Sequence, residues 1–253
     1  MKVRTAYITN TGKVRPKNED ALLVDGKLFR ETSMNTPQVE EFEVYEFTPF
    51  AVADGLGGHA CGEKASGLVL EVLKEEKPEK PEYIKEIILK AKKRLDEYIN
   101  EGNEFCYGFG TALAGVYLSK DRAIVFNVGD CRVYRFRDGN LELLTEDHTY
   151  LFQYYKEGRI SYEELRLHPE RHILESAILG GYPDLPEVFV REEEVKKGDT
   201  FLICSDGLWE ALSFREKVSC LSKEDIKLRA NCLFELAYQD GKDNISFILL
   251  ECD

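Results

Sequence analysis

The sequence lacks the features that would place it on a membrane or on nucleic acid. No stretch of its 253 residues approaches the roughly 18 consecutive apolar residues of a spanning helix, and the N-terminus has no apolar signal-like run. There is no basic block, and 47 acidic residues against 34 lysines and arginines give a formal net charge of −13. Binding to nucleic acid or to an anionic membrane depends on cations, so neither is an expected partner. We therefore expect a cytoplasmic protein.

Motifs for redox chemistry or zinc are also missing. The seven cysteines include no C-x-x-C pair, and several lie in apolar runs such as Phe201–Cys204. We therefore expect reduced, mostly buried thiols. Histidine is scarce, and none of the four has close zinc-ligand spacing. His168 and His172 are four residues apart, but Pro169 argues against the helix that would align them.

The composition indicates one folded domain. Hydrophobic residues make up 43% of the chain and charged residues 32%, which supplies enough apolar surface for a full core. The nearest approach to a linker, Lys77–Pro81, is too short to separate domains, so we expect a single domain over residues 1–253. Ala65–Leu73 and Ile84–Ile99 have the apolar period of amphipathic helices.

Short runs rich in β-branched and aromatic residues predict strands. They are Val3–Thr9, Ala21–Val24, Phe42–Ala53, Thr111–Leu118, Ala123–Val128, Val133–Phe136, Leu141–Leu144, Phe201–Cys204 and Ile245–Leu250. Asp138-Gly139 predicts a hairpin turn, because Asp-Gly accepts positive φ angles. Further helices are predicted over Tyr150–Lys156, Tyr162–Leu167 and Lys223–Ala237, the last with Ser222 as its N-cap.

Strands in runs, rather than alternating with helices, predict the α+β class. We expect a four-layer α-β-β-α sandwich of two antiparallel sheets flanked by helices.

Four aspartates occupy the same place in this pattern. Asp54, Asp130 and Asp206 each end an apolar run beside a glycine, and Asp243 precedes the run Ile245–Leu250. Singly, each pair of aspartate and glycine is explained by a turn. Four carboxylates at rigid strand ends, with few basic residues to pair with them, indicate a hard divalent cation. Ligation by oxygen alone favours Mg²⁺ or Mn²⁺ over zinc.

Two such ions suit the hydrolysis of phosphate esters, since they activate a shared water and neutralise the phosphoryl oxygens. A substrate phosphate would also need an arginine that binds two of its oxygens. Arg15 is the candidate, because it lies in a turn between two predicted strands and is followed by Asn18, Glu19 and Asp20.

Seven motifs occur in order along the chain. They are Arg15–Asp20, Asp54–Ser66, Gly110–Thr111, Val128–Arg132, Leu144–Thr149, Ser205–Trp209 and Asp243–Asn244. Together they resemble the bacterial branch of the metal-dependent protein phosphatases, the phosphatase 2C family. The resemblance implies a serine/threonine phosphoprotein phosphatase that uses two or three Mn²⁺ or Mg²⁺ ions. It also implies attack by a metal-bridging hydroxide, without a phosphoenzyme.

The resemblance assigns roles to the predicted metal ligands. Asp54 would bridge two ions, with the Gly55 carbonyl as a further ligand. Asp206 and Asp243 would complete the shell of the second ion, and Asp130 would be the ligand of a third.

Four more residues receive roles in the same way. Glu19 and Asp20 would hold metal-bound waters, and Arg15 would bind the substrate phosphate. His59 would either protonate the leaving group or form a structural hydrogen bond.

Gly158–Gly181 resembles the flap region of the family and the segment after it, so we expect a flap subdomain around residues 150–180. Where the family usually reads Asn-x-Leu-Thr-Arg-Ala-Leu-Gly, this chain reads His-Ile-Leu-Glu-Ser-Ala-Ile-Leu-Gly over His172–Gly180. Glu175 and Ser176 thus replace a threonine and an arginine. Arg30–Phe47 predicts a longer early hairpin than the family minimum.

The expected partners are phosphorylated proteins, in a pathway with a serine/threonine kinase by family analogy, and we expect a monomer. Two other functions stay open: a non-catalytic pseudophosphatase that binds a partner, and a two-metal phosphodiesterase or nuclease.

Two shorter matches are rejected. Gly55–Ala60 fits the G-x-G-x-x-A motif of dinucleotide-binding folds, but Asp54 would repel a pyrophosphate there. Cys131–Arg137 has the Cys-x5-Arg spacing of cysteine-dependent phosphatases, but it has the pattern of a strand entering a hairpin. Trp209 is interpreted as a core residue.

Overall fold

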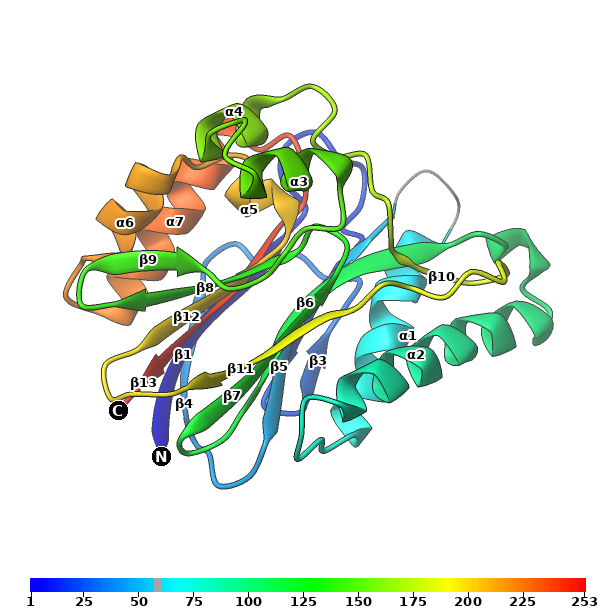
Figure 1. The fold of residues 1–253 in the computed structure, drawn as a ribbon, viewed down its shortest axis with the longest axis horizontal. Helices are drawn as coiled ribbons and strands as arrows, with labels where there is room; N and C mark the ends of the chain where they lie inside the picture. Colours follow the sequence, from blue (N-terminus) through cyan, green and yellow to red (C-terminus); the bar gives the residue numbers. More distant parts are fainter. Residues whose placement is uncertain (57–60) are drawn as a thin grey trace.

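Two stacked β-sheets form the centre of the molecule. The structure, a computed structural model, describes residues 1–56 and 61–253. Within these residues the two sheets lie face to face, every strand pairing is antiparallel, and helices cover the outer face of each sheet (Figure 1). The predicted α+β sandwich of four layers is confirmed.

The first sheet has six strands in the order β4-β1-β13-β12-β8-β9, which places the first strand of the chain beside the last. These strands are β1 (Lys2–Asn10), β4 (Gln38–Glu43), β8 (Arg132–Arg137), β9 (Asn140–Leu143), β12 (Thr200–Cys204) and β13 (Ile245–Cys252). The second sheet has the order β11-β7-β6-β5-β2-β3, with β10 beside β6. These strands are β2 (Asp20–Val24), β3 (Lys27–Phe29), β5 (Thr48–Gly55), β6 (Gly110–Leu118), β7 (Arg122–Val128), β10 (Ile178–Leu179) and β11 (Phe189–Glu194).

The helices fall into three groups. On the second sheet lie α1 (Gly62–Glu75) and α2 (Tyr83–Asn100), followed by the 3₁₀ turn η1 (Glu104–Cys106). On the first sheet lie α5 (Asp206–Trp209), α6 (Phe214–Leu221) and α7 (Ile226–Asp240). Beyond the ends of the sheets lie α3 (Tyr150–Lys156) and α4 (Tyr162–Leu167), which share a small apolar cluster of their own (Figure 1).

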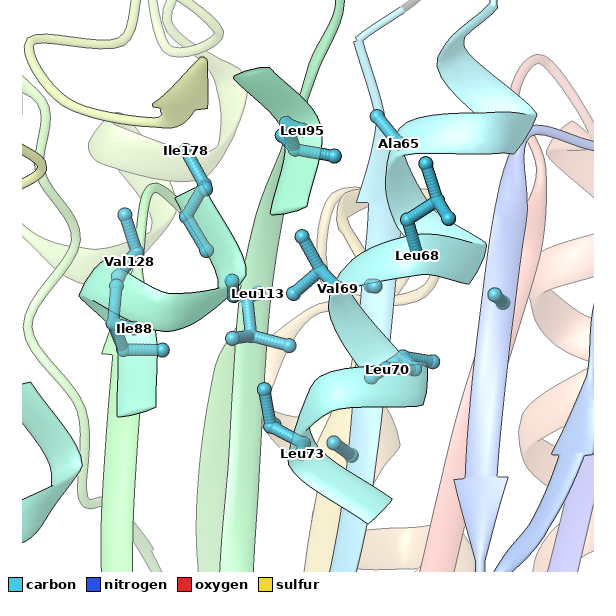
Figure 2. Packing of buried hydrophobic residues seen from close by; sticks show 14 of the residues in the cluster. Ala65, Leu68, Val69, Leu70, Leu73, Ile88, Leu95, Leu113, Val128 and Ile178 are labelled. Carbon is cyan, nitrogen blue, oxygen red and sulfur yellow. The ribbon is translucent and has the colours of Figure 1, made fainter. Parts of the chain in front are cut away.

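Alternation along the strands divides the core into layers. On β6, Leu113 and Tyr117 face the helices, whereas Ala114 and Val116 face the opposite sheet. Successive side chains of a strand point to opposite faces, so one strand serves two apolar layers. Val69 of α1 packs in the same outer layer as Leu113 (Figure 2). None of the helices in the described ranges has both the length and the apolar character needed to cross a bilayer.

Several predicted elements are confirmed. Helices α3 and α4 have exactly the predicted bounds, and the hairpin between β8 and β9 has Asp138 and Gly139 at φ of 51° and 78°. Two predictions were wrong. Phe42–Ala53 is not one strand, because the chain crosses between the sheets there, with β4 pairing with β1 and β5 with β2. For the same reason Arg30–Phe47 is not a local hairpin.

The C-terminal helix also begins later than predicted. Ser222 is the C-cap of α6, and Asp225 is the N-cap of α7, with its side chain accepting from the backbone N–H of Lys227. Serine and aspartate are both good N-caps, so the sequence alone did not choose between them.

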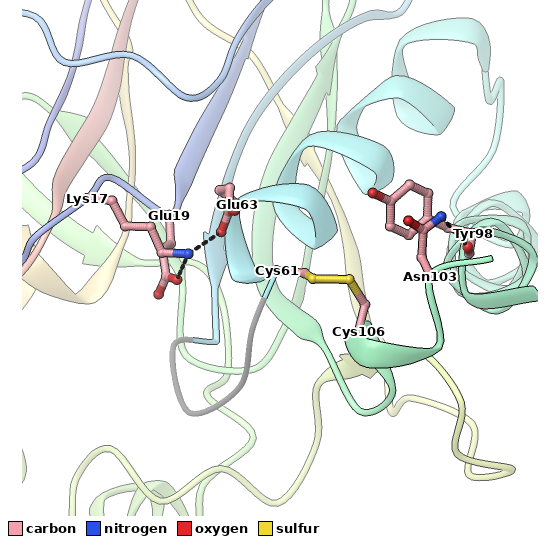
Figure 3. Close-up of a disulfide and its surroundings, with 7 residues drawn as sticks. All are labelled: Lys17, Glu19, Cys61, Glu63, Tyr98, Asn103 and Cys106. Atoms are coloured by element: carbon pink, nitrogen blue, oxygen red, sulfur yellow. Dashed lines mark hydrogen bonds and ion pairs between the residues drawn. A yellow bond between two sulfur atoms is a disulfide. The ribbon is translucent and has the colours of Figure 1, made fainter. Parts of the chain in front are cut away.

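The expectation of reduced thiols was wrong for four cysteines. One disulfide joins Cys61 to Cys106 (Figure 3), and a second joins Cys220 to Cys232. The partners are 45 and 12 residues apart in sequence, so they meet only because the chain folds the N-cap of α1 beside η1 and packs α6 against α7. Disulfides persist mainly in oxidising surroundings, so the cysteines no longer support a cytoplasmic location.

We expect thiol labelling to show how many cysteines are free and how many are in disulfides. Cys131, Cys204 and Cys252 are buried free thiols. Denatured but unreduced protein should therefore take up three alkylating groups, as measured by intact mass, and reduced protein should take up seven. Uptake of seven groups without a reductant would show that the disulfides are absent.

Candidate active site

The ends of strands from both sheets meet around one small cavity. Asp54 is the last residue but one of β5, Asp130 follows β7, Asp206 follows β12 and Asp243 precedes β13. The cavity has a volume of about 110 Å³. It is lined by Arg15, Glu19, Asp54, Gly55, Leu56, Asp130, His172, Leu174, Asp206, Asp243 and Asn244. The structure thus brings seven of the nine predicted site residues to one place.

The other two predicted residues are placed differently. Asp20 pairs with Asp54 across the β2–β5 ladder, is 1% exposed and lies behind the cavity wall. Ser205 donates from Oγ to Asp20 Oδ2 at 2.9 Å, whereas Oδ1 has no partner. His59 lies outside the described residues, so its predicted role is not addressed by the structure.

The buried carboxylates repel one another. Burial raises the pKa of Asp54 well above its ordinary value, and the neighbouring carboxylates of Asp20, Asp206 and Asp130 raise it further. Burial likewise raises the pKa of Asp206, with Asp130 and Asp243 adding to it. The pKa values of Asp20 and Asp130 are raised to about 7, mainly by burial. Such a cluster is stable as carboxylates only if cations are added to it.

The unpartnered carboxylate oxygens at the site are suitable ligands for a hard divalent cation. Asp20 Oδ1 and Asp206 Oδ1 are buried without a hydrogen-bond partner, and unpartnered buried carboxylate oxygens are costly unless a cation takes them as ligands. In the described part of the chain, however, no three acidic, histidine or cysteine side chains are already arranged as a ligand set. One of the carboxylates, Asp243, accepts instead from Arg15 Nη2 at 2.6 Å.

Two glycines allow the backbone to close around the cavity. A Cβ atom at Gly55 would lie 2.4 Å from the carbonyl oxygen of Gly62 and 2.7 Å from that of Glu19. A Cβ atom at Gly207 would lie 2.0 Å from the carbonyl oxygen of Asn244. Any side chain at these positions would push the acidic loops apart, which explains the glycine after Asp54 and after Asp206 in physical terms.

Hydrogen bonds hold the N-terminal loop against the loop before β13. Asn244 accepts from the backbone N–H of Glu19 at 2.9 Å and donates to the carbonyls of Thr11 and Lys17. Lys17 Nζ lies 3.1 Å from Glu19 and 2.7 Å from Glu63 of α1 (Figure 3). Glu19 is therefore placed at the cavity by contacts on both sides.

A residue that the sequence analysis missed is Glu210. It follows Asp206 by four residues, one helical turn, and that spacing was the available signal. Its Oε1 is buried without a partner, and its charge adds to the raised pKa of Asp206. Its Oε2 accepts from Arg171 Nη2 at 2.6 Å, which ties the segment after α4 to this side of the cavity.

A buried arginine supports the loop that carries Asp130. Arg132 is fully buried, bonds both carboxylate oxygens of Asp147 and stacks 3.5 Å from the centre of the Trp209 ring. Trp209 in turn donates from Nε1 to the carbonyl of Asp130 at 2.9 Å. Trp209 is 1% exposed, as expected for a core residue. The nearby phenol of Tyr162, on α4, accepts from Arg132 Nη1 at 3.3 Å.

Comparison with known proteins assigns the family. The family model described as protein phosphatase 2C matches residues 44–230. The chain belongs to this family. The resemblance inferred from the seven motifs is confirmed, and the phosphatase 2C model covers β5 to β12 and α1 to α6.

Named relatives of this phosphatase 2C chain are bacterial. It is 30% identical over 260 residues to the serine/threonine protein phosphatase PstP of Mycobacterium tuberculosis, covering 98% of this chain and 45% of that protein. It is 31% identical over 266 residues to the serine/threonine phosphatase stp of Listeria monocytogenes, covering 98% and 95%. The chain therefore spans about half the length of the mycobacterial relatives and nearly all of the listerial one.

Solved phosphatase structures have the same fold. The crystal structure of M. tuberculosis PstP/Ppp superposes with a TM-score of 0.80 at 29% identity over 100% of both chains. A structure of the PstP catalytic domain in complex with two manganese ions superposes with a TM-score of 0.76 at 28% identity, covering 99% of both chains.

Proposed function

We propose that this chain is a metal-dependent serine/threonine phosphoprotein phosphatase that hydrolyses phosphate monoesters. The observation that carries the proposal is the single cavity that joins Glu19, Asp54, Asp130, Asp206 and Asp243 with Arg15. Five carboxylates from separated segments of the chain have no reason to meet there unless cations neutralise them. The family membership and the manganese ions of the PstP catalytic domain support the same reading.

Each described residue then has a proposed role. Asp54 and Asp206 would be the central metal ligands, because burial and neighbouring carboxylates raise the pKa of both well above its ordinary value. Asp243 and the Gly55 carbonyl would complete the set of ligands. Asp130 would hold a third ion. When bound, Mn²⁺ or Mg²⁺ would supply an activated water and stabilise the charge of the phosphoryl oxygens.

Glu19 and Asp20 would not contact the metal ions directly but would accept hydrogen bonds from metal-bound waters. Asp20 is buried behind Asp54, where Ser205 holds the Asp20 carboxylate by a hydrogen bond. Asp20 would therefore orient a metal-bound water and the neighbouring carboxylate of Asp54. Glu19 is fixed between Asn244 and Lys17.

The proposed substrates are phosphorylated proteins, and a serine/threonine kinase would supply them. A small cavity lined mainly by polar residues admits a phosphate group but not a whole peptide, so the flanking residues of a substrate would rest on the surface around it. The segment around α3 and α4 is proposed as a flap subdomain, and the chain is proposed to act as a monomer.

The function is tested by turnover of phosphopeptides. Purified protein should release phosphate from phosphoserine and phosphothreonine peptides with Mn²⁺, lose this activity in EDTA and regain it when Mn²⁺ is restored. Equal turnover in EDTA would contradict the metal mechanism. No turnover of any monoester with Mn²⁺ bound would favour the pseudophosphatase, and faster turnover of a phosphodiester would favour the phosphodiesterase.

Replacing Arg15 by alanine should mainly raise KM. The guanidinium would bind phosphate in the ground state and the transition state alike, so its loss weakens binding without slowing the bound complex. A charge-assisted contact contributes about 1.5–3 kcal/mol, so KM should rise about 10- to 100-fold. Initial rates over a range of phosphopeptide concentrations measure this. Lys13→Ala, in the same loop but bonded to the Gln239 carbonyl, is the matched control. An unchanged KM would remove Arg15 from the substrate site.

A further inference from the structure

His172 lies in the wall of the carboxylate cavity. A volume of about 110 Å³ holds only a few water molecules or one phosphoryl group with its ions, so each lining residue is close to whatever is bound there. His172 is an exposed residue that lines this cavity, and within residues 1–56 and 61–253 its imidazole forms no hydrogen bond. The side chain is therefore free to meet a substrate.

The proposed reaction needs a proton donor that the other lining residues do not supply. A serine or threonine side chain leaves phosphorus as an alkoxide, which is a poor leaving group unless it is protonated. Arg15 does not give up its proton, and the amide of Asn244 is not an acid. The four lining aspartates are proposed metal ligands, and Glu19 would accept hydrogen bonds from metal-bound waters. Among the lining residues that the structure describes, His172 is the remaining one whose side chain can carry and donate a proton, whereas His59, the other candidate for this role, lies outside the described residues.

The backbone on both sides of His172 is held in place. Before it, Arg171 donates to Glu210 Oε2 at 2.6 Å and to the His168 carbonyl at 3.0 Å. After it, Leu174 forms a β-bridge with Thr149, and the N–H of Glu175 donates to the His148 carbonyl at 2.8 Å. These contacts fix where the imidazole enters the cavity.

Two other histidines of the described ranges have structural roles. His148 is buried, and its Nδ1 accepts from the N–H of Gly129 at 2.9 Å. His168 Nδ1 accepts from the N–H of Glu170 at 3.2 Å. Neither lines the cavity.

We propose that His172 is a catalytic residue that protonates the leaving oxygen of the substrate, an inference that rests on the proposed phosphatase function. Water oxygen forms a bond to phosphorus while the bond from phosphorus to the seryl or threonyl oxygen breaks. The N–H proton of the imidazolium passes to that oxygen, so the products are the free alcohol, dihydrogen phosphate and neutral imidazole. Solvent then returns a proton to the imidazole and takes one from the phosphate.

The test compares two leaving groups with saturating Mn²⁺. The phenolate of p-nitrophenyl phosphate departs without a proton, whereas the alkoxide of a phosphothreonine peptide needs one. For His172→Asn we expect kcat on the peptide to fall about 10²-fold, and kcat on p-nitrophenyl phosphate to change by less than about threefold. His172→Gln should behave in the same way. His168→Asn, whose side chain can still accept from the Glu170 N–H, is the matched control and should resemble the wild type on both substrates.

The possible results distinguish a wrong role for His172 from a wrong proposal of phosphatase function. Equal losses on both substrates, or a peptide kcat within about threefold of the wild type, would overturn the role of His172. Wild-type protein without metal-dependent turnover of either substrate would refute the proposed function and the assignment together. The thermal midpoint of each variant with Mn²⁺ shows whether the fold and the metal site are retained.

Discussion

Asp206→Asn is expected to lower kcat by at least about 10³-fold, which corresponds to about 4 kcal/mol of transition-state stabilisation. The amide has the same shape as the carboxylate but lacks its negative charge, so it is a weak ligand for Mn²⁺ or Mg²⁺. Asp206 Oδ1 is buried without any other partner, so nothing else in the described residues takes over its role. Phosphate release from a phosphothreonine peptide with saturating Mn²⁺ measures the effect.

The same substitution should have the opposite effect on the metal-free protein. Neighbouring carboxylates raise the pKa of Asp206, so removing its charge relieves repulsion. Without metal, the variant should therefore melt at a higher temperature than the wild type, and the rise in Tm on adding Mn²⁺ should be smaller. Asp121→Asn, at the exposed turn before β7, is the matched control and should change neither activity nor Tm. Full activity of Asp206→Asn would rule out Asp206 as a ligand.

Arg132→Met is expected to destabilise the fold by about 3–5 kcal/mol, because it leaves the carboxylate of Asp147 buried without its partner. The side chains of the pair are 0% and 2% exposed, and Arg132 bonds both carboxylate oxygens. For a domain of this size the loss corresponds to a fall in Tm of about 6–20 °C. Thermal denaturation followed by circular dichroism measures it.

A double variant tests whether the loss of stability comes from the unpaired charge of Asp147. Arg132→Met with Asp147→Leu removes both charges, so it should be more stable than Arg132→Met alone. Arg159→Met, at an exposed arginine next to α3, should leave Tm nearly unchanged. A double variant as unstable as the sum of the two single variants would show that the two side chains are not energetically coupled, so that the loss does not come from the unpaired charge.

The buried pair of Arg132 and Asp147 is connected to the proposed metal site. Trp209 stacks on Arg132 and donates to the carbonyl of Asp130, and it lies at the end of the short helix that begins with Asp206. A variant that loosens Arg132 should therefore also disturb the loop of a proposed metal ligand. The buried ion pair is in this sense part of the framework of the cavity.

Local patterns along the chain predicted the fold class and most of the candidate site. Short runs rich in β-branched and aromatic residues predicted most strands, and aspartates at their ends marked Asp54, Asp130, Asp206 and Asp243. These signals are local, because the composition of a run and its turn residues depend only on near neighbours along the chain. The order of the seven motifs added the family.

Contacts between distant segments became visible only in the folded chain. The crossing of β4 to the other sheet, the two disulfides and the buried pair of Arg132 with Asp147 all join residues whose local sequence gives no sign of the partner. His172 lines the cavity for the same reason, since the segment after α4 reaches it only when both sheets have stacked. Glu210, by contrast, had a local signal in its four-residue spacing from Asp206. Spacing along the chain fixes which face a side chain takes, whereas the packing of sheets and helices fixes what it meets there.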